Sequence, residues 1–358
     1  MRMLSLTACL ITWLSIPVDL ATELALAHVP VRTQTNGCGL EPPTTPGETG
    51  RLSLQVGELE REYLLHLPVG YDETISSSLV LAFHGYTGSA SGIESYTGLS
   101  SLADEEGAIV VYPEATSFIS EEGNRISSWN DLACNASPGR RGPTCKSTAL
   151  QYPFSPSCAG RESTCNWCTC NDDLAFVDAL LDELENTLCV APKRIYATGS
   201  SNGGMFVQRL GCSMADRFAA VAPTHGFLAK GFNCRPSEPI SLLQIYGNFD
   251  QVVPGDGSAA SDGYQYVRAS AVMRKWAKKK SQGCNRKVVA YPTEHDGFRG
   301  LSCNQKPNCS AGTEVVTCSW NAGHVWPAAG GRRFGNELIW TFFDTNPKSS
   351  IGLMSQDS

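Results

Sequence analysis

Residues 199–203, whose sequence is GSSNG, constrain the fold more than any other segment of this chain. They follow residues 194–198, RIYAT, which are typical of a strand, and they lead into residues 202–212, which have the pattern of a helix. A sharp turn from a strand into a helix leaves no room for side chains at its flanks, which explains the glycines. The turn also raises its central serine, Ser201, above the sheet, where the helix N-terminus stabilises negative charge. The segment therefore predicts a strand–turn–helix unit that presents a serine nucleophile.

Strands and helices alternate along the rest of the chain. We expect strands at residues 62–67, 78–83, 108–112, 193–198, 218–222, 241–246, 287–290 and 314–318. We expect helices at residues 173–188, 202–212, 270–280 and 334–343. Continuous apolar runs such as residues 78–83 are typical of strands buried on both faces of a parallel sheet. The sequence therefore predicts an α/β fold, with a mostly parallel sheet covered by helices on both faces.

The N-terminal 27 residues have the pattern of a signal peptide. Arg2 precedes an apolar stretch, residues 4–16, that is too short to span a bilayer, and residues 25–27 offer a small-residue cleavage site. No second apolar run approaches membrane-spanning length, so we expect a secreted protein without membrane insertion. The chain has a net charge of -7 and no long block of like charge in its sequence, which argues against nucleic-acid binding. We expect the mature chain to be a monomer.

The cysteine content also indicates export. Of 15 cysteines, Cys9 lies in the predicted signal peptide, which leaves an even number for disulfides of the kind that form in oxidising compartments. Residues 165–170, with the sequence CNWCTC, have a spacing that zinc sites also use. No histidine pair or second CxxC lies near them, so we favour disulfides and expect no metal. Glycosylation sequons at Asn135 and Asn308 fit a secretory route.

The expected domain organisation is one main domain in which a single segment, residues 115–171, interrupts the alternation of strands and helices. An extended leader at residues 28–60 precedes the main domain at residues 61–345, and a tail at residues 346–358 follows it. Residues 115–171 are rich in Ser, Gly, Pro and Cys, and so long an irregular stretch is unusual inside a compact domain. We interpret it as a cysteine-rich insertion, braced by local disulfides and lying over the sheet edge. Its aromatic residues offer an apolar wall for a substrate: Tyr152, Phe154 and Trp167.

A serine nucleophile needs a base, which in turn needs an orienting carboxylate. Of the histidines downstream of Ser201, His324 follows a predicted strand and a glycine, which is where a base is expected in an α/β sheet. His225 ends the strand that directly follows the serine turn and is expected to pack there. His295 lies in a polar turn and is expected at the surface. His324 is therefore the predicted base, and Ser200 is a weaker nucleophile candidate than Ser201.

The predicted acid and oxyanion donors also follow buried strands. Asp250 comes directly after the strand at 241–246, at a carboxyl end, whereas the fallback acids Asp256 and Asp262 lie deeper in a Gly/Ser loop. An oxyanion needs backbone N–H donors, and we expect one from Asn202 and a second from Tyr86, in the turn after the strand at 78–83.

The motifs spread over residues 61–343 resemble one family. They are YLLHLP at 63–68, HG at 84–85, WN at 129–130, DDLAFV at 172–177, GSSNGGM at 199–205, GNFD at 247–250, residues 276–284 and GHVWP at 323–327. Together they are similar to the secreted polyhydroxybutyrate-depolymerase-like and feruloyl esterases of the α/β-hydrolase superfamily. The insertion at 136–170 departs from both branches of that family.

The resemblance implies an α/β-hydrolase fold and a serine esterase that uses no cofactor. It implies an acyl-enzyme on Ser201, a triad completed by Asp250 and His324, and an ester-bearing polymer or small ester as substrate. The GCG and TCSW segments look more like the feruloyl branch, and the SNGGM elbow looks more like the polyester branch, so both substrates stay open. Trp129 and Trp326 are candidates for substrate contact, and a structural role for Trp129 is an equal alternative.

Two further functions remain as alternatives. A serine peptidase or an acyltransferase could use the same three residues, because fold and triad do not determine the acyl acceptor. A catalytically silent binding protein on the same scaffold is the third hypothesis. Such proteins usually lack a member of the triad, whereas this chain retains all three candidates in the expected order: Ser201, Asp250 and His324.

Overall fold

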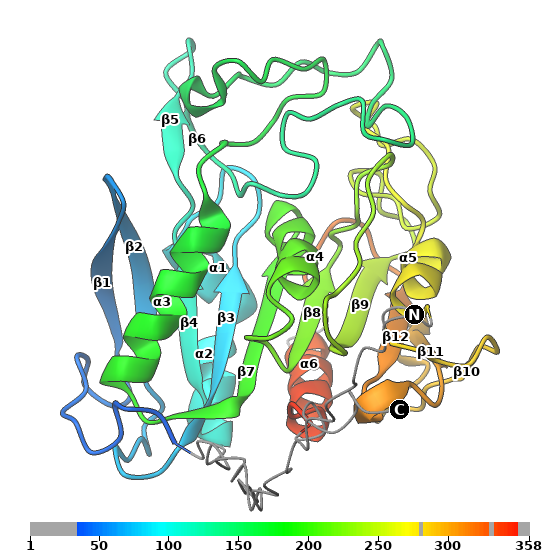
Figure 1. The fold of residues 1–358 in the computed structure, drawn as a ribbon. Coiled ribbons are helices and arrows are strands. Elements are labelled where there is room, and N and C mark those ends of the chain that lie inside the picture. The colour runs from blue at the N-terminus through cyan, green and yellow to red at the C-terminus, as the bar shows by residue number, and fades with distance from the viewer. Residues whose placement is uncertain (1–33, 279–281, 329–332, 350–358) are drawn as a thin grey trace, which may run out of the picture. The chain divides into compact units, whose positions relative to one another are not determined.

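The computed structural model describes residues 34–278, 282–328 and 333–349, which Figure 1 draws as a ribbon. The predicted signal peptide, the start of the predicted leader and most of the predicted tail lie outside the described residues. No helix within the described ranges is long and apolar enough to cross a bilayer.

A 10-stranded sheet forms the centre of the described chain (Figure 1). Its strands run in the order β1-β2-β4-β3-β7-β8-β9-β12-β11-β10. The six from β4 to β12 in that order are parallel, and antiparallel strands flank them at both edges. The strands are β1 (Thr49–Val56), β2 (Leu59–His66), β3 (Ser77–Phe83), β4 (Ile109–Pro113), β7 (Val190–Ser200), β8 (Ala220–Thr224), β9 (Ser241–Gly247), β10 (Val289–Ala290), β11 (Ser302–Lys306) and β12 (Val315–Trp320).

Helices cover both faces of the sheet, and each face has its own apolar core. The helices are α1 (Ala90–Thr97), α2 (Leu99–Glu106), α3 (Asp173–Thr187), α4 (Asn202–Ser213), α5 (Ala269–Trp276) and α6 (Phe334–Thr345). Buried side chains of α3, α4 and α5 share one core with the sheet, and those of α1, α2 and α6 share the other. Alternate residues of each buried strand reach alternate cores, which is why these strands are apolar throughout. The predicted fold class is confirmed.

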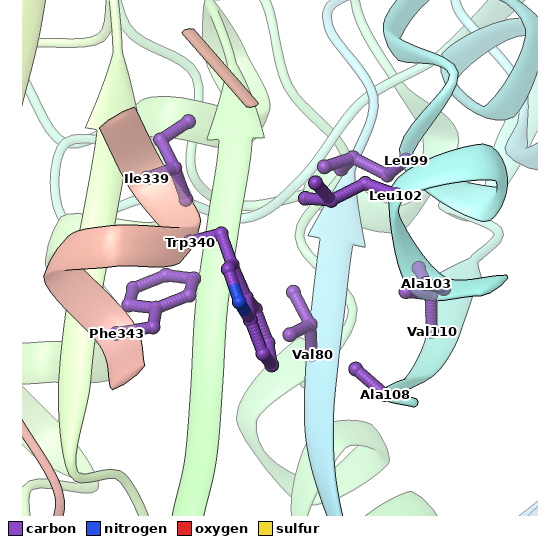
Figure 2. Close-up of a pocket in the computed structure, with 9 residues that line it drawn as sticks. All are labelled: Val80, Leu99, Leu102, Ala103, Ala108, Val110, Ile339, Trp340 and Phe343. Carbon is purple, nitrogen blue, oxygen red and sulfur yellow. The ribbon is translucent and has the colours of Figure 1, made fainter. Parts of the chain in front are cut away.

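A small gap lies in the core between α2, α6 and the strands β3 and β4, and Figure 2 shows the side chains that line it. The side chains that meet there are Val80, Leu99, Leu102, Ala103, Ala108, Val110, Ile339, Trp340 and Phe343. They leave a cavity of about 10 Å³, which is the size of a single water, and they offer almost no polar partner to hold one. We interpret this gap as packing and not as a binding site.

The cysteine-rich insertion begins with a hairpin, β5 (Ser117–Ile119) and β6 (Arg125–Ser127), and continues as irregular chain above the carboxyl ends of the parallel strands (Figure 1). Its six cysteines pair with one another, as predicted, in the disulfides Cys134–Cys168, Cys145–Cys165 and Cys158–Cys170. The CNWCTC sulfurs are thus divided among three disulfides, and none is a thiolate that could bind zinc. The other disulfides are Cys38–Cys189, Cys212–Cys234, Cys284–Cys309 and Cys303–Cys318.

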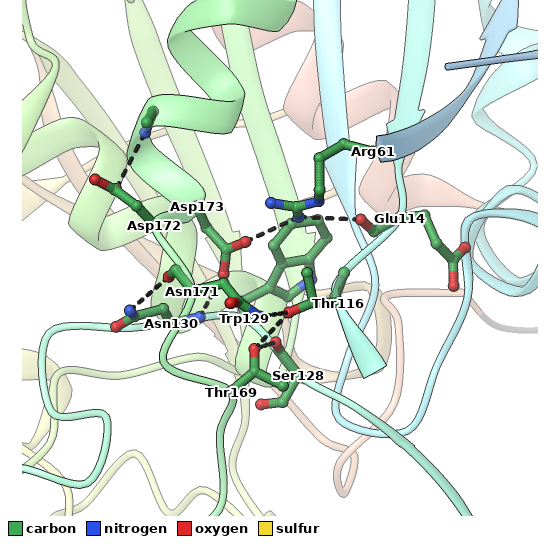
Figure 3. Close-up of polar contacts among 12 residues, drawn as sticks. Arg61, Glu114, Thr116, Ser128, Trp129, Asn130, Thr169, Asn171, Asp172 and Asp173 are labelled. Atoms are coloured by element: carbon green, nitrogen blue, oxygen red, sulfur yellow. Dashed lines mark hydrogen bonds and ion pairs between the residues drawn. The ribbon is translucent and has the colours of Figure 1, made fainter. Parts of the chain in front are cut away.

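A buried ion pair ties the insertion to the sheet and to α3, as Figure 3 shows. Arg61 of β2 lies 2.8 Å from one carboxylate oxygen of Asp173, and both side chains are almost fully buried. The other oxygen of Asp173 accepts a hydrogen bond from the backbone N–H of Asn130, which follows β6 in the insertion. Its neighbour Asp172 instead caps α3 by accepting from the N–H of Ala175.

One predicted glycosylation site is corrected by its burial. Asn135 is 4% exposed, and its amide nitrogen donates to the sulfur of Cys158 and to the carbonyl oxygen of Cys168. A glycan on that nitrogen would have no path to solvent, so Asn135 serves the disulfide cluster instead. Asn308 is exposed on a turn and stays a predicted site.

Candidate active site

Ser201 stands on a strained turn between β7 and α4. Its backbone has φ 57° and ψ -120°, a conformation that non-glycine residues rarely adopt. The flanking glycines are required because a Cβ at Gly203 would lie 2.3 Å from the carbonyl oxygen of Phe83, and one at Gly199 would lie 2.8 Å from Gly203. The predicted strand–turn–helix unit is therefore present, and its packing against the end of β3 leaves room only for glycine at positions 199 and 203.

Asp250 and His324 form a hydrogen-bonded pair at the same edge of the sheet. The Oδ2 atom of Asp250 lies 2.7 Å from Nδ1 of His324, and its Oδ1 atom accepts from the N–H groups of Val252 and Val253, each at 2.8 Å. Burial acts to raise the pKa of Asp250, but the bonds with His324 and the two amides outweigh it and lower that pKa. The carboxylate is therefore ionised and keeps the ring proton on Nδ1, so Nε2 of His324 is left as the acceptor.

The sheet brings the three predicted triad residues to one edge. Ser201 follows β7, Asp250 follows β9 and His324 follows β12, and these strands lie within four consecutive positions of the sheet. Within the described ranges, no hydrogen bond joins Ser201 to His324. Hydrogen bonds of this kind are often long without substrate and tighten when it binds.

The alternative bases and acids have other partners. His295 pairs with Glu337 of α6 at 3.0 Å, and it is half-buried where a surface position was expected. Asp256 accepts hydrogen bonds from Ser258 in its own loop, and Asp262 accepts one from the hydroxyl of Tyr152. Neither fallback acid is hydrogen-bonded to His324, so the geometry favours Asp250.

The turn that carries Tyr86 and the start of α4 at Asn202 both adjoin Ser201. A Cβ built on Gly85 would be 3.3 Å from Cβ of Ser201, so the turn that carries Tyr86 runs directly beside the serine. The side-chain oxygen of Asn202 accepts from the N–H of Trp129 at 2.7 Å. That side chain thus holds the insertion against the turn between β7 and α4. The backbone N–H of Asn202 lies at the N-terminus of α4, where backbone N–H groups have no partner within the helix.

His84 supports this turn in a way that the sequence did not reveal. Its Nε2 atom accepts from the N–H of Ala115, so its proton lies on Nδ1 and donates to the carbonyl oxygen of Gly85. The carbonyl oxygen of His84 accepts from the indole N–H of Trp129 at 3.0 Å. Burial lowers the pKa of His84, so the ring stays neutral. The only signal in the sequence was the His-Gly pair itself, which is also typical of an ordinary turn.

The structure corrects the substrate-contact role expected for two tryptophans. Trp129 is 0% exposed and packs against Phe83 and Phe206. Trp326 is 2% exposed, and its indole N–H donates to Asn336 of α6. Both rings are buried, so Trp129 supports the backbone of His84 and Trp326 packs against α6. Sequence cannot separate the two roles, because a core tryptophan and a pocket tryptophan have the same apolar signature.

Four aromatic rings gather beside the predicted oxyanion turn. Tyr86 packs against Tyr152 and Trp167 of the insertion, with ring centroids 5.4 and 6.0 Å apart, and Tyr264 of the loop after Asp250 contacts the same two rings. We call these four residues the aromatic group. Phe154, by contrast, packs against the disulfide cluster and lies outside the group. The hydroxyl of Tyr86 is buried and has no hydrogen-bond partner among the described residues.

Comparisons with known proteins find relatives among esterases. The chain is 28% identical over 271 residues to feruloyl esterase B of Piromyces equi, covering 74% of this chain but only 42% of that protein. It is 27% identical over 331 residues to feruloyl esterase C of Emericella nidulans, covering 91% of this chain and 97% of that protein. No family model matches the chain.

Solved structures share the fold at low sequence identity. An acetyl xylan esterase from Aspergillus awamori superposes with a TM-score of 0.50 at 13% identity, covering 83% of this chain and 99% of that one. A protein called sOPH superposes with a TM-score of 0.52 at 13% identity, covering 88% and 93%. At this level of identity the likeness concerns the fold, which is that of the α/β-hydrolases.

Proposed function

We propose that this chain, a carboxylic ester hydrolase related to the feruloyl esterases, cleaves its substrate through an acyl-enzyme formed on Ser201. The observation that carries the proposal is the 2.7 Å bond between an ionised Asp250 and Nδ1 of His324, at the sheet edge where Ser201 stands on a strained turn. A nucleophile, a base and an orienting carboxylate are the groups that acyl transfer requires. The named activities of the relatives favour esters over the peptide alternative.

In the proposed reaction, Nε2 of His324 accepts the hydroxyl proton of Ser201 as the serine oxygen attacks the ester carbonyl carbon. The backbone N–H groups of Asn202 and Tyr86 stabilise the oxyanion. The protonated imidazole, stabilised by Asp250, then donates its proton to the leaving alkoxide oxygen while the ester C–O bond breaks. Water repeats the sequence on the acyl-enzyme, which releases the carboxylic acid and restores Ser201.

The substrate class that we propose is an ester of an aromatic acid, of the hydroxycinnamoyl type, carried by an extracellular polysaccharide. The aromatic group is what favours it, because flat rings pack well against tyrosine and tryptophan. Tyr86 joins this group to the turn beside Ser201. The names of the relatives, feruloyl esterases, agree with this choice. An aliphatic polyester of hydroxyalkanoate units is the alternative.

We propose an extracellular location on the strength of the seven disulfides, which join 14 cysteines and are stable where the surroundings oxidise thiols. The proposed organisation is a signal peptide at residues 1–27, a leader that Cys38 fastens to Cys189, and one catalytic domain up to residue 345. The predicted boundary at 60/61 is too late, because β1 (Thr49–Val56) already pairs with β2 in the central sheet and so belongs to that domain.

Replacement of the nucleophile tests the function. Ser201→Ala should lower kcat for 4-nitrophenyl acetate on the order of a millionfold, since members of a triad act as a unit. Ser213→Ala, at the exposed end of the same helix, is the matched control and should keep full activity. A fluorophosphonate should label Ser201, as peptide mass spectrometry can show. Labelling at Ser200, or at neither residue, would overturn the assignment.

A substrate panel tests the acyl class. With methyl ferulate, a hydroxybutyrate dimer ester and a chromogenic peptide amide, we expect the highest kcat/KM for methyl ferulate. Faster cleavage of the hydroxybutyrate ester would favour the polyester alternative, and cleavage of the amide at a comparable rate would favour a peptidase.

A further inference from the structure

A second serine–histidine pair lies directly behind the proposed triad. The Oγ atom of Ser200, the last residue of β7, is 2.7 Å from Nε2 of His225, which follows β8. Ser200 is 6% exposed and His225 is 2% exposed, so the bond is shielded from water. The reaction proposed above uses neither side chain, and a buried hydrogen-bonded imidazole next to a reactive one needs a physical explanation.

The backbone of His225 is held in a strained position. Its φ is 33°, a positive value that is unusual for a residue with a side chain, and its N–H donates to the carbonyl oxygen of Ile245 in β9 at 2.8 Å. Strain of this kind persists only where the surroundings enforce it, and it concentrates at functional sites. Here β9 anchors the backbone of His225, and Ser200 anchors its ring.

The ring held in this way lies against the proposed base. The ring centroids of His225 and His324 are 4.5 Å apart, and the ring planes meet at 68°. Asp250 fixes His324 at Nδ1, but a single hydrogen bond still allows the imidazole to rotate about it. An edge-to-face contact from a second, immobile ring removes that rotation.

We infer that His225, held by Ser200, is a positioning residue that orients the ring of His324 toward Ser201. The inference rests on the proposed function, since it assigns a role within that catalytic site. It explains why the turn carries two consecutive serines: Ser201 is the proposed nucleophile, and Ser200 is hydrogen-bonded to His225, the residue that positions the base.

The protonation state of His225 suits this role. Burial lowers the pKa of His225 most, the neighbouring His324 lowers it further, and Asp250 opposes them, which leaves that pKa at about 3. The titratable groups that face the ring are thus His324 and Asp250, with the hydroxyl of Ser200 as its hydrogen-bond partner. A neutral His225 adds no positive charge beside His324 when that imidazole becomes protonated during the reaction.

The same pair is unsuited to acyl transfer of its own. Ser200 is buried, and its Oγ atom is hydrogen-bonded to His225. Within the described ranges, no carboxylate is hydrogen-bonded to the ring of His225, whereas His324 has Asp250. A serine–histidine pair without an orienting acid is a poor nucleophile, so positioning is the role that fits.

Three variants separate the ring from the hydrogen bond. His225→Ala removes both, His225→Phe keeps a ring without the bond, and Ser200→Ala removes the bond alone. We expect kcat for 4-nitrophenyl acetate to fall on the order of a hundredfold in His225→Ala, because small displacements of a catalytic group cost about that much. The fall should be smaller in His225→Phe and in Ser200→Ala, and KM should stay unchanged in all three. Combining Ser200→Ala with His225→Phe should add no further loss, because both remove the same bond.

A spectroscopic measurement completes the test without substrate. The proton on Nδ1 of His324, shared with Asp250, should give a downfield proton NMR signal that broadens in His225→Ala and persists in His295→Ala, the control. If the wild type hydrolyses esters but His225→Ala keeps full kcat and a sharp signal, the inference is wrong. If the wild type hydrolyses no ester, the proposed function fails, while the NMR comparison still reports whether His225 immobilises His324. If His225→Ala does not fold, His225→Phe and Ser200→Ala carry the same comparison.

Discussion

At the scale of single residues, the proposed chemistry depends on which atom of the imidazole carries the proton. Asp250 imposes that choice, because its carboxylate has only acceptors to offer to Nδ1 of His324. An amide in the same place can still accept from Val252 and Val253 through its oxygen. Its nitrogen would then face Nδ1 with hydrogens, and the ring would have to move its proton to Nε2, the atom that must accept from Ser201.

Asp250→Asn should therefore lower kcat on the order of ten-thousandfold, the size of effect expected when the base takes the wrong tautomer. Asp256→Asn is the matched control, since Asp256 bonds only within its own loop, and we expect it to change kcat less than twofold or so. Initial rates with 4-nitrophenyl acetate provide the measurement. Equal losses in the two variants would mean that the acid has been assigned to the wrong residue.

The residues of the proposed triad were predicted from local signals. Ser201 was chosen from the glycines around it, and Asp250 and His324 were chosen because each lies a few residues after a strand. The roles of His84, His225 and Trp129 depend instead on side chains that arrive from distant segments. His225 was expected to pack after its strand, and it does, but its contact with His324 arises only when β8, β9 and β12 are side by side. No spacing in the sequence reports such a contact.

At the scale of elements, the strands with long buried runs were predictable, whereas the half-exposed strands β1 and β11 were missed. Continuous apolar runs identify β3, β4, β7 and β9, because both faces of each strand are covered. β1 alternates exposed and half-buried residues, and its period-two signal from Leu52, Leu54 and Val56 was readable but weak. α1 and α2 are 8 residues each and rich in Ser and Glu, so they have too few apolar positions for a helical pattern to emerge.

Two adjacent aspartates show how differently one residue type acts at the start of a helix. Asp173→Ala should leave the guanidinium of Arg61 buried without its partner and lower the free energy of unfolding by about 3–5 kcal/mol. Asp172→Ala removes only a helix cap and should cost about 1 kcal/mol. Urea unfolding with the disulfides intact measures both. Replacing the pair together, as Arg61→Met with Asp173→Ala, should recover part of the loss, and equal costs for the two single variants would refute the distinction.

At the scale of the whole molecule, the fold class was predictable but the path of the insertion was not. Alternating strands and helices admit few arrangements, whereas 14 cysteines admit very many pairings and no periodic pattern selects among them. Folding brings Tyr152 and Trp167 of the insertion to Tyr86 at the predicted oxyanion turn, and the loop after Asp250 contributes Tyr264 to the same group. Three segments distant in sequence thus meet beside the proposed nucleophile.

The insertion can be shortened without disturbing the sheet, because its ends already lie together. The Cα atoms of Cys134 and Cys168 are 5.6 Å apart, a distance that a three-residue Gly-Gly-Ser linker in place of residues 135–167 spans easily. Cys170→Ser in the same variant avoids an unpaired thiol, because Cys158 is removed. The clamp between Asn202 and Trp129 lies outside the replaced segment and remains.

We expect this shortened enzyme to keep turnover of 4-nitrophenyl acetate within a few-fold and to lose at least about tenfold in kcat/KM for methyl ferulate, since packing of one buried ring is worth about 1.5–3 kcal/mol. Trp167→Ala, which leaves the disulfides in place, should show a smaller loss of kcat/KM for methyl ferulate with acetate turnover kept. This variant carries the test if the larger deletion misfolds. Ile119→Ala, at an exposed position of β5, is the surface control and should keep the preference of the wild type. If the folded shortened enzyme loses acetate turnover as completely as ferulate turnover, the insertion carries part of the catalytic machinery and not only the acyl preference.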